Sequence, residues 1–293
     1  MSGFKTEAKD KFPIRHAVVS LSMVCNLRCR LCASRSPYYV NPVPNTVDEL
    51  NEALGRFFKI VSCVDLLTLS GGEPLLYPFF PELFSMLRQY QKQIFQLEII
   101  TNGTLVPQEG FVEQLCCWPG KVKILIDDYG KSLSGKVTQI DDALNKAMIT
   151  HLVRNNTNID PHCGGWVDFG DPRQRRWNAI AEAEAIHAKC VYPQKLNFCF
   201  TIKGGCVYPC PQVRACKELG NTSRYEDYID LFDDTLTVTD QRKKIEAIYA
   251  AKSFAACAYC NGMCDDSERF IPAEQLTAEE LRAIRAEKRR IRK

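Results

Sequence analysis

Short apolar runs alternate with amphipathic stretches over roughly the first 170 residues of this chain. Five runs have the length of buried strands, at residues 16–22, 64–70, 95–101, 121–127 and about 162–168. Apolar residues at helical spacing lie between them and predict helices at residues 46–60, 80–92, 108–117 and 136–152, the first opened by a Thr46–Glu49 capping box. Strands that alternate with helices in this way favour an α/β fold with a parallel sheet.

The pattern changes after a further helix, which we expect at about residues 173–189. Eight of the fifteen cysteines fall between Cys190 and Cys264, which indicates a separate, cysteine-rich region. Two strand-like pieces, residues 195–202 and 206–208, flank two consecutive glycines and predict a β-hairpin. A helix follows at about residues 240–256, and a basic amphipathic helix is expected at residues 277–293.

One stretch just after the first predicted strand concentrates cysteine. Cys25, Cys29 and Cys32 have the spacing C-x3-C-x2-C. Thiolates are the usual ligands of iron–sulfur clusters, so these three can hold three irons of a 4Fe–4S cluster and leave the fourth iron open. The alternative is a zinc site, but zinc usually takes four ligands in paired motifs, which this spacing fits poorly.

A glycine-rich turn follows the second predicted strand. Gly71 and Gly72 allow a ligand to approach the backbone closely, and Glu73 supplies a carboxylate that could hold an ammonium group. Taken alone, such a motif is more often an ordinary turn. Its position about forty residues after the cysteines, at the end of the next predicted strand, favours a functional interpretation.

Together the two motifs resemble the signature of the radical S-adenosylmethionine (SAM) superfamily. The resemblance implies a partial, TIM-like βα barrel of five or six strands, a 4Fe–4S cluster on the three cysteines, and SAM chelated by the open iron. It also implies that one electron, from a flavodoxin- or ferredoxin-type reductant, cleaves SAM to a 5′-deoxyadenosyl radical. The segment 71–73 would bind the amino group of SAM. Leu31 stands where the family usually has an aromatic residue over the adenine, and leucine can still supply an apolar wall.

Other candidate site residues follow from strand order, since α/β sheets bind ligands at the carboxyl ends of their strands. Asn102 follows the third strand in a T-N-G that the family often carries. Asp127 ends the fourth and, by the resemblance, could accept the ribose hydroxyls of SAM, although turn formation explains it equally well. Around the fifth predicted strand, Asp168 and His162 are candidates to hold or deprotonate a substrate hydroxyl or amine, with a plain turn as the alternative.

The cysteine-rich region resembles the twitch domain, a shortened SPASM domain that adds an auxiliary 4Fe–4S cluster. The resemblance assigns this second cluster to Cys190, Cys210, Cys257 and Cys260. Zinc is the alternative there. A further auxiliary cluster could use Cys199, Cys206, Cys216 and Cys264, but the full C-x2-C-x5-C-x3-C run of SPASM domains is absent. The remaining cysteines are expected to be small buried hydrophobes, namely Cys63, Cys116, Cys117 and Cys163. We therefore expect three parts of the chain: a radical SAM partial barrel at residues 13–188, a twitch-like cluster domain at residues 189–265, and a C-terminal segment with the basic amphipathic helix at residues 266–293.

The composition limits which classes of binding partner and which cellular location are expected. The chain has 293 residues, of which 45% are hydrophobic, and a formal net charge of +3, which is too small to argue for a nucleic-acid or membrane partner. The sequence has neither a transmembrane run nor the apolar core of a signal peptide. Fifteen cysteines without a secretory signal indicate metal binding in a reducing compartment, so a cytoplasmic location is expected.

The resemblance to the radical SAM superfamily implies an oxidoreductase that abstracts hydrogen from a small polar substrate, such as a sugar, a cyclitol or a nucleotide-linked sugar. Oxidation by the auxiliary cluster is expected because single-twitch members of the family include an aminocyclitol dehydrogenase. No additional N-terminal domain for grasping a leader peptide is evident, which favours a small molecule. The alternatives are maturation of a peptide or protein, epimerisation, and a noncatalytic iron–sulfur protein.

Overall fold

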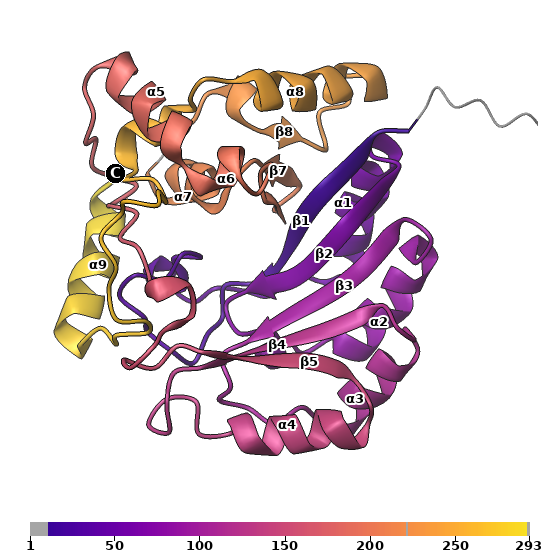
Figure 1. Ribbon diagram of the computed structural model, residues 1–293. Coiled ribbons are helices and arrows are strands. Elements are labelled where there is room, and N and C mark those ends of the chain that lie inside the picture. The colour runs from indigo at the N-terminus through magenta and orange to yellow at the C-terminus, as the bar shows by residue number, and fades with distance from the viewer. Residues whose placement is uncertain (1–10, 221, 292–293) are drawn as a thin grey trace, which may run out of the picture.

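The computed structural model describes residues 11–220 and 222–291 and is built around one mixed sheet (Figure 1). The strand order is β5-β4-β3-β2-β1-β6-β7-β8. All neighbours from β5 to β6 are parallel, and β7 and β8 are antiparallel to the strands beside them. The predicted α/β class with five or six parallel strands is therefore confirmed. The strands are β1 (Pro13–Ser22), β2 (Cys63–Gly71), β3 (Ile94–Thr101), β4 (Val122–Asp128), β5 (Thr150–Asn155), β6 (Phe200–Lys203), β7 (Cys206–Tyr208) and β8 (Ile229–Asp230).

The helices form three groups around this curved sheet, and α5 to α8 lie at the end that carries β7 and β8 (Figure 1). α1 to α4 lie along its outer face, whereas α9 and the loops that follow β5 lie on the other side (Figure 1). The helices are α1 (Val47–Ile60), α2 (Phe80–Leu87), α3 (Glu109–Cys116), α4 (Val137–Lys146), α5 (Ile180–Lys189), α6 (Val191–Gln194), α7 (Pro211–Leu219), α8 (Val238–Ala250) and α9 (Ala278–Ile291). Short 3-10 helices occupy Ser36–Tyr38, Pro74–Leu76, Arg88–Tyr90, His162–Gly164, Tyr225–Asp227 and Ala255–Tyr259. Within the described residues, no helix is long and apolar enough to cross a membrane.

The predicted capping box opens α1. The Glu49 N–H donates to Thr46 Oγ1 at 3.2 Å, and the Thr46 N–H donates to the Glu49 carboxylate at 2.7 Å. Two N–H groups that the helix leaves unsatisfied thus gain partners, which typically contributes about 1 kcal/mol. The first helix is therefore one of the elements that the sequence specifies locally.

An aromatic cluster fills the core between α2, α3 and the sheet. The rings of Phe80 and Phe111 meet edge to face with centroids 4.7 Å apart, and Trp118 is almost fully buried beside Phe84. Because the buried side of α3 carries Phe111 and Leu115, the end of the helix turns its cysteines to solvent. The expectation that four cysteines would be buried hydrophobes is wrong, since Cys116, Cys117 and Cys163 are exposed and Cys63 is half-buried.

The fifth strand lies elsewhere than predicted. α4 ends at Lys146, and Met148 adopts a left-handed φ of 55°, after which residues 150–155 form β5 beside β4. β5 is an edge strand that exposes Leu152 and Val153, so its sequence lacks the apolar run that marks a buried strand. Residues 162–168, predicted as this strand, instead form a 3-10 turn and a single bridge from Trp166 to Phe270.

The hairpin predicted in the cysteine-rich region is present. β6 and β7 pair antiparallel around Gly204 and Gly205, and both glycines have a positive φ. β6 also pairs in parallel with β1, so the hairpin extends the main sheet. Helices α5 and α8 are shorter than predicted, but they occupy the expected parts of the chain. The final helix begins one residue later than predicted, and Arg292 and Lys293 of its predicted span lie outside the described residues. Ile291, placed on the apolar stripe of the final helix by its sequence, has a side chain outside the described residues.

Candidate functional site

The three cysteines of the C-x3-C-x2-C motif lie in the loop after β1 and line one cavity of about 240 Å³. Gly71, Gly72 and Glu73 line the same cavity, so the two sequence motifs meet in space. Burial raises the pKa of Cys25 and of Cys29 to about 12. A raised pKa favours the neutral thiol. A bound metal cation reverses this preference, because it stabilises the thiolate. Side-chain amides of Asn102 and Gln275 donate to Cys25 Sγ at 3.8 Å and to Cys29 Sγ at 3.3 Å. This donor set fits a three-cysteine cluster.

Gly71 and Gly72 allow two backbone segments to pack closely against each other. The Gly72 N–H donates to the Ser22 carbonyl at 2.7 Å, and the Glu73 N–H donates to the Val24 carbonyl at 2.9 Å. A Cβ at Gly71 would lie 2.2 Å from the Ser22 oxygen, and one at Gly72 would lie 1.9 Å from the Val24 oxygen. The glycines therefore let the end of β2 pack directly on the chain that leads into the cysteine loop. From the sequence, these glycines were expected to make room for a ligand. Their contact with the backbone of the cysteine loop was not predicted.

Glu73 is almost fully buried at the junction of β2 and β3. Its Oε1 accepts hydrogen bonds from the Leu75 N–H and the Thr101 hydroxyl, and its Oε2 accepts one from the Asn102 N–H. Burial raises the pKa of this carboxyl, and the three donors oppose the rise. A carboxylate oxygen can accept two hydrogen bonds. Among the described residues Oε2 has one donor, so it keeps an acceptor position for an ammonium group.

Replacing Glu73 with Gln should weaken SAM binding. A charged hydrogen bond to an ammonium group contributes about 1.5–3 kcal/mol, which corresponds to roughly a 10- to 150-fold rise in Kd. Equilibrium binding of SAM to the reconstituted protein measures this change. Glu98→Gln is the matched control, because Glu98 is also a buried carboxyl and accepts a hydrogen bond from Thr68. Glu98 lines neither this cavity nor the second cavity described below. Equal SAM affinity in the Glu73 variant and the parent would show that Glu73 only ties β2 to β3.

The strand ends place two more predicted residues in the cavity. Asn102 joins β3 to the cysteine loop, donating to Asn26 Oδ1 at 3.0 Å as well as to the Cys25 sulfur. Asp127, at the end of β4, is held by the guanidinium of Arg154 at 2.8 and 2.7 Å and by Asn156 Nδ2 at 2.8 Å. Asp127 is therefore the acid of a buried ion pair and not simply a turn residue.

A second cavity of about 380 Å³ adjoins the first. Asp127, Tyr129 and Trp166 line both cavities, and the rings of Tyr129 and Trp166 meet edge to face at 5.6 Å. Among the predicted residues, the second cavity is also lined by Leu31 and His162. Asp168 lines neither cavity, and its carboxylate accepts the Gly170 N–H at 2.8 Å, as a turn residue does.

Arg154, Asn156 and Arg269 also line the second cavity, and none of these polar residues was predicted from the sequence. Arg154 lies on β5 and Asn156 directly follows it, and both come just after the predicted helix 136–152, where no strand was expected. Residues 150–155 are mostly exposed, so the sequence there offers no apolar pattern that would mark a strand. Arg269 lies beyond the cysteine-rich region and carries no local motif.

The four cysteines expected to hold a second cluster line one enclosed apolar cavity between α5, α7 and the 3-10 turn at residues 255–259. Burial raises the pKa of Cys210 and of Cys257 to about 12, and that of Cys260 well above its usual range. The Phe254 N–H donates to Cys257 Sγ at 3.4 Å, and the Gly262 N–H donates to Cys260 Sγ at 3.2 Å. Backbone donors of this kind favour thiolates, so the chemistry of the donor set fits a bound cluster.

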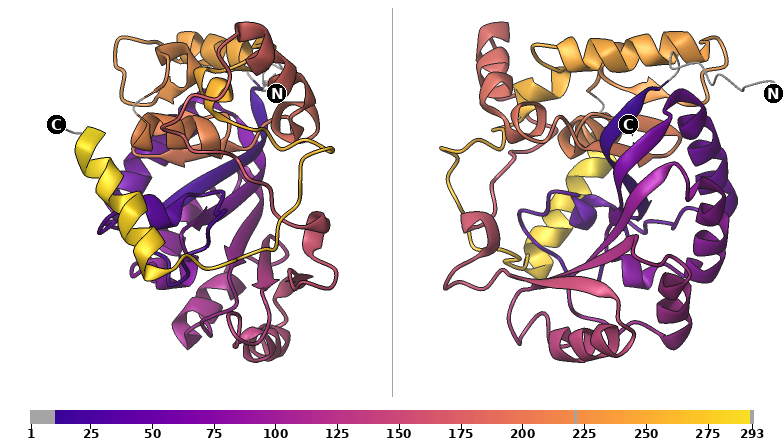
Figure 2. Two further views of the ribbon diagram at one scale, coloured as in Figure 1. Left: turned by 90° about the vertical axis from the view of Figure 1, so that its left-hand side faces the viewer. Right: turned by 45° about the vertical axis from the view of Figure 1, so that its right-hand side comes forward.

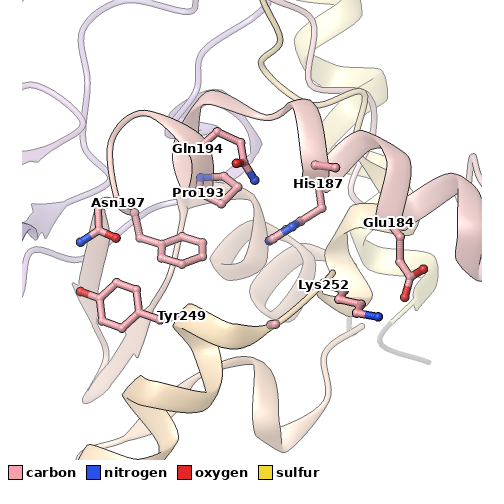
Figure 3. Close-up of a pocket in the computed structure, with 10 residues that line it drawn as sticks. Glu184, His187, Pro193, Gln194, Asn197, Tyr249 and Lys252 are labelled. Carbon is pink, nitrogen blue, oxygen red and sulfur yellow. The ribbon is translucent and has the colours of Figure 1, made fainter.

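A buried nitrogen beside these cysteines supports the same fit. His187 on α5 lines both the four-cysteine cavity and a neighbouring surface cleft of about 600 Å³ (Figure 3). Its Nε2 is buried and has no hydrogen-bond partner among the described residues. A group bound in one of the two cavities that His187 lines would supply the missing acceptor. No three His, Cys, Asp or Glu side chains in residues 11–220 and 222–291 are grouped to hold a single metal ion.

Comparison with known proteins assigns the N-terminal half of the chain. The family model "Radical SAM superfamily" matches residues 19–155. An S-adenosylmethionine-dependent nucleotide dehydratase of a Thermoplasmatales archaeon is 29% identical over 140 residues, which are 47% of this chain and 43% of that protein. A GTP 3′,8-cyclase of Acidothermus cellulolyticus is 32% identical over 195 residues, which are 63% of this chain and 43% of that protein. The match thus spans less than half the length of each of these relatives.

Two solved structures share the fold over most of the chain. The anSMEcpe structure with bound AdoMet has a TM-score of 0.52 at 15% identity, covering 94% of this chain and 98% of that one. The structure of BtrN in complex with AdoMet and 2-DOIA has a TM-score of 0.50 at 16% identity, covering 91% of this chain and 100% of that one. At these identities the likeness concerns the fold. Residues 19–155 are thus a domain of the radical SAM superfamily, whose members bind a 4Fe–4S cluster and SAM.

Proposed function

We propose that this radical SAM protein abstracts a hydrogen atom from a small, polar, anionic substrate and oxidises it, with a second 4Fe–4S cluster in the four-cysteine cavity. The observation that carries the proposal is the 380 Å³ cavity lined by arginines, which shares its inner wall with the cavity of the three cysteines. Small-molecule sites typically measure about 300–1,000 Å³. Such a cavity suits a single sugar- or nucleotide-sized molecule.

The charge balance of the cavity favours an anion. Arg154 is neutralised by Asp127 through two hydrogen bonds. Arg269 donates to the Cys264 carbonyl at 3.1 Å, and within the described part of the chain it makes no ion pair. Its guanidinium thus brings a positive charge to the cavity that can pair with a phosphate or carboxylate. The curated relatives named above are a nucleotide dehydratase and a GTP cyclase, which agrees with a phosphorylated or nucleotide-linked substrate.

The residues of the two cavities would have different roles in such a reaction. Cys25, Cys29 and Cys32 would hold the first cluster, which supplies the electron that cleaves SAM to the 5′-deoxyadenosyl radical. Glu73 keeps an acceptor position for the SAM ammonium group. The edge-to-face pair of Tyr129 and Trp166 forms the apolar wall that the cavities share and helps to exclude water.

Oxidation of a substrate alcohol requires the loss of a hydrogen atom, an electron and a proton. The hydrogen atom leaves the C–H bond for the 5′ carbon of deoxyadenosyl. The second cluster, held by Cys190, Cys210, Cys257 and Cys260, would accept the electron. We assign the hydroxyl proton to His162, because this imidazole lines the cavity and histidine is a common general base. The substrate carbon then carries a carbonyl group.

A substrate panel tests this proposal. Reduced, anaerobically reconstituted protein is supplied with SAM and with neutral sugars or cyclitols, their phosphorylated or nucleotide-linked counterparts, or peptides. We expect anionic small molecules to stimulate 5′-deoxyadenosine formation, with deuterium transferred from the labelled C–H position and a carbonyl product. Stimulation by peptides alone would refute a small-molecule substrate, and a product at the same oxidation level as the substrate would refute the oxidation.

Arg269→Met should weaken binding of an anionic substrate, since it removes the unpaired positive charge. We expect KM to rise about 10- to 100-fold, as for loss of one charged hydrogen bond, while substrate-independent cleavage of SAM stays near the parent rate. Arg282→Met is the matched control, because Arg282 is exposed on α9. An unchanged KM for the anionic substrate in the Arg269 variant would contradict the charge argument.

A further inference from the structure

The chain returns to the first cysteine loop after the cysteine-rich region. Residues 270–277, which we name the C-terminal strap, run beside this loop and lead into α9 (Figure 2). The Arg30 N–H donates to the Glu274 carbonyl and the Leu276 N–H to the Arg28 carbonyl, both at 2.8 Å, with Gln275 opposite Cys29 in an antiparallel bridge. The strap thus pairs with the loop as a short strand would.

Arg30 joins the loop to the strap and to the start of α9 through ion pairs. Arg30 contacts the carboxylates of Glu274 at 3.1 Å and Glu280 at 2.7 Å. Ala273, which is fully buried, takes a left-handed φ of 56° just before the pairing begins. A non-glycine residue adopts this conformation at a cost, so the surrounding contacts hold the strap in one register.

The side chain of Gln275 is oriented by its own hydrogen bonds. Its Oε1 accepts the Arg28 N–H at 2.7 Å, which turns the amide nitrogen the other way. Nε2 then donates to the Ala273 carbonyl at 2.7 Å and to Cys29 Sγ at 3.3 Å. The corresponding bond to Cys25, from Asn102, is longer at 3.8 Å. Gln275 therefore aims a fixed donor at the sulfur of one presumed cluster ligand.

We propose that Gln275 is a positioning residue that raises the reduction potential of the SAM-binding cluster through its hydrogen bond to Cys29. Reduction adds negative charge to the cluster and its thiolates. A donor at the thiolate sulfur stabilises the more negative, reduced state more than the oxidised one, and hydrogen bonds to sulfur are among the factors that set cluster potentials. The inference concerns the first cluster and does not depend on the substrate or on the second cluster.

The strap also connects the two cysteine sites along the chain. Cys260 is followed by only a short segment before Gln275 reaches Cys29. A change in the strap can therefore affect the first cluster in two ways, by removing the hydrogen bond or by loosening the segment that carries it. The test must separate these two effects.

A redox titration of the reconstituted protein, followed by electron paramagnetic resonance, provides the test. The first cluster is identified as the signal that changes when SAM is added, and the potential is then measured without SAM. Gln275→Leu removes the donor and should shift this potential to more negative values. A tenfold change in the equilibrium between the two oxidation states would appear as about 59 mV. Gln275→Glu keeps the acceptor for the Arg28 N–H but replaces the donor with an anionic oxygen, and should shift the potential further.

Glu274→Gln is the matched control, because it weakens the ion pair with Arg30 and leaves the Gln275 amide in place. We expect its potential to equal that of the parent. A parent-like potential in an iron-loaded Gln275→Leu or Gln275→Glu protein would overturn the proposal. An equal shift in Glu274→Gln would overturn it too, since the potential would then respond to loosening of the strap. If the Leu variant fails to load iron, the near-isosteric Glu variant decides.

Discussion

Replacing Cys25, Cys29 and Cys32 together with alanine is expected to abolish reductive cleavage of SAM. The three side chains line one cavity with Glu73, and Asn102 and Gln275 of the strap supply hydrogen bonds to two of the sulfurs. Removing all three ligands leaves no thiolate to hold the first cluster. The four-cysteine cavity lies in another part of the fold and should keep its cluster, so iron content should fall from about eight to about four atoms per chain.

The measurements are iron content and 5′-deoxyadenosine formation with a strong reductant. Substitution of Cys63, Cys116 and Cys117 with alanine is the control, because it removes the same number of thiols. Two of them are exposed, one is half-buried, and all lie outside both cysteine cavities. The control should retain iron and cleavage. If the Cys25, Cys29 and Cys32 variant still cleaved SAM, the three cysteines could not be the ligands of the SAM-binding cluster.

The central strands and the first helix were predictable because their signals are local. β1 to β4 are buried runs of apolar residues, and the capping box at Thr46 lies within four residues of chain. The meeting of the cysteine motif with Gly71–Glu73 also followed from strand order, since β1 and β2 are parallel neighbours whose carboxyl ends lie side by side.

The errors arose where solvent or distant parts of the chain decide the structure. β5 is an exposed edge strand, so its residues carry no apolar pattern, and the prediction moved the strand to the turn at residues 162–168. Because of that error, Arg154 was not predicted as a site residue, whereas Asp168 was predicted as one although it does not line the cavity. Gln275 meets Cys29 across 246 residues of sequence, and no local pattern in the tail indicates such a contact.

Substituting Cys257 and Cys260 together with alanine should separate oxidation from SAM cleavage. Both sulfurs line the cavity with Cys190 and Cys210, and both accept backbone N–H donors. The first cluster is ligated elsewhere, so the variant should lose about four irons per chain and still form 5′-deoxyadenosine. With substrate present, the proposed function predicts that deuterium transfer continues while the carbonyl product disappears, because the proposed electron acceptor of the substrate radical has been removed.

Stability must be measured on the same protein, because a cluster on these cysteines would tie the 3-10 turn at residues 255–259 to α5 and α7. We expect thermal unfolding of the double variant at a lower temperature than the parent. Cys199→Ala with Cys216→Ala is the matched control, since it removes two buried thiols of the same region and should keep all the iron. Loss of iron in that control would indicate a further auxiliary cluster. Carbonyl product formed at the parent rate by a folded Cys257 and Cys260 variant would show that the second site is structural, because oxidation would then proceed without its electron acceptor.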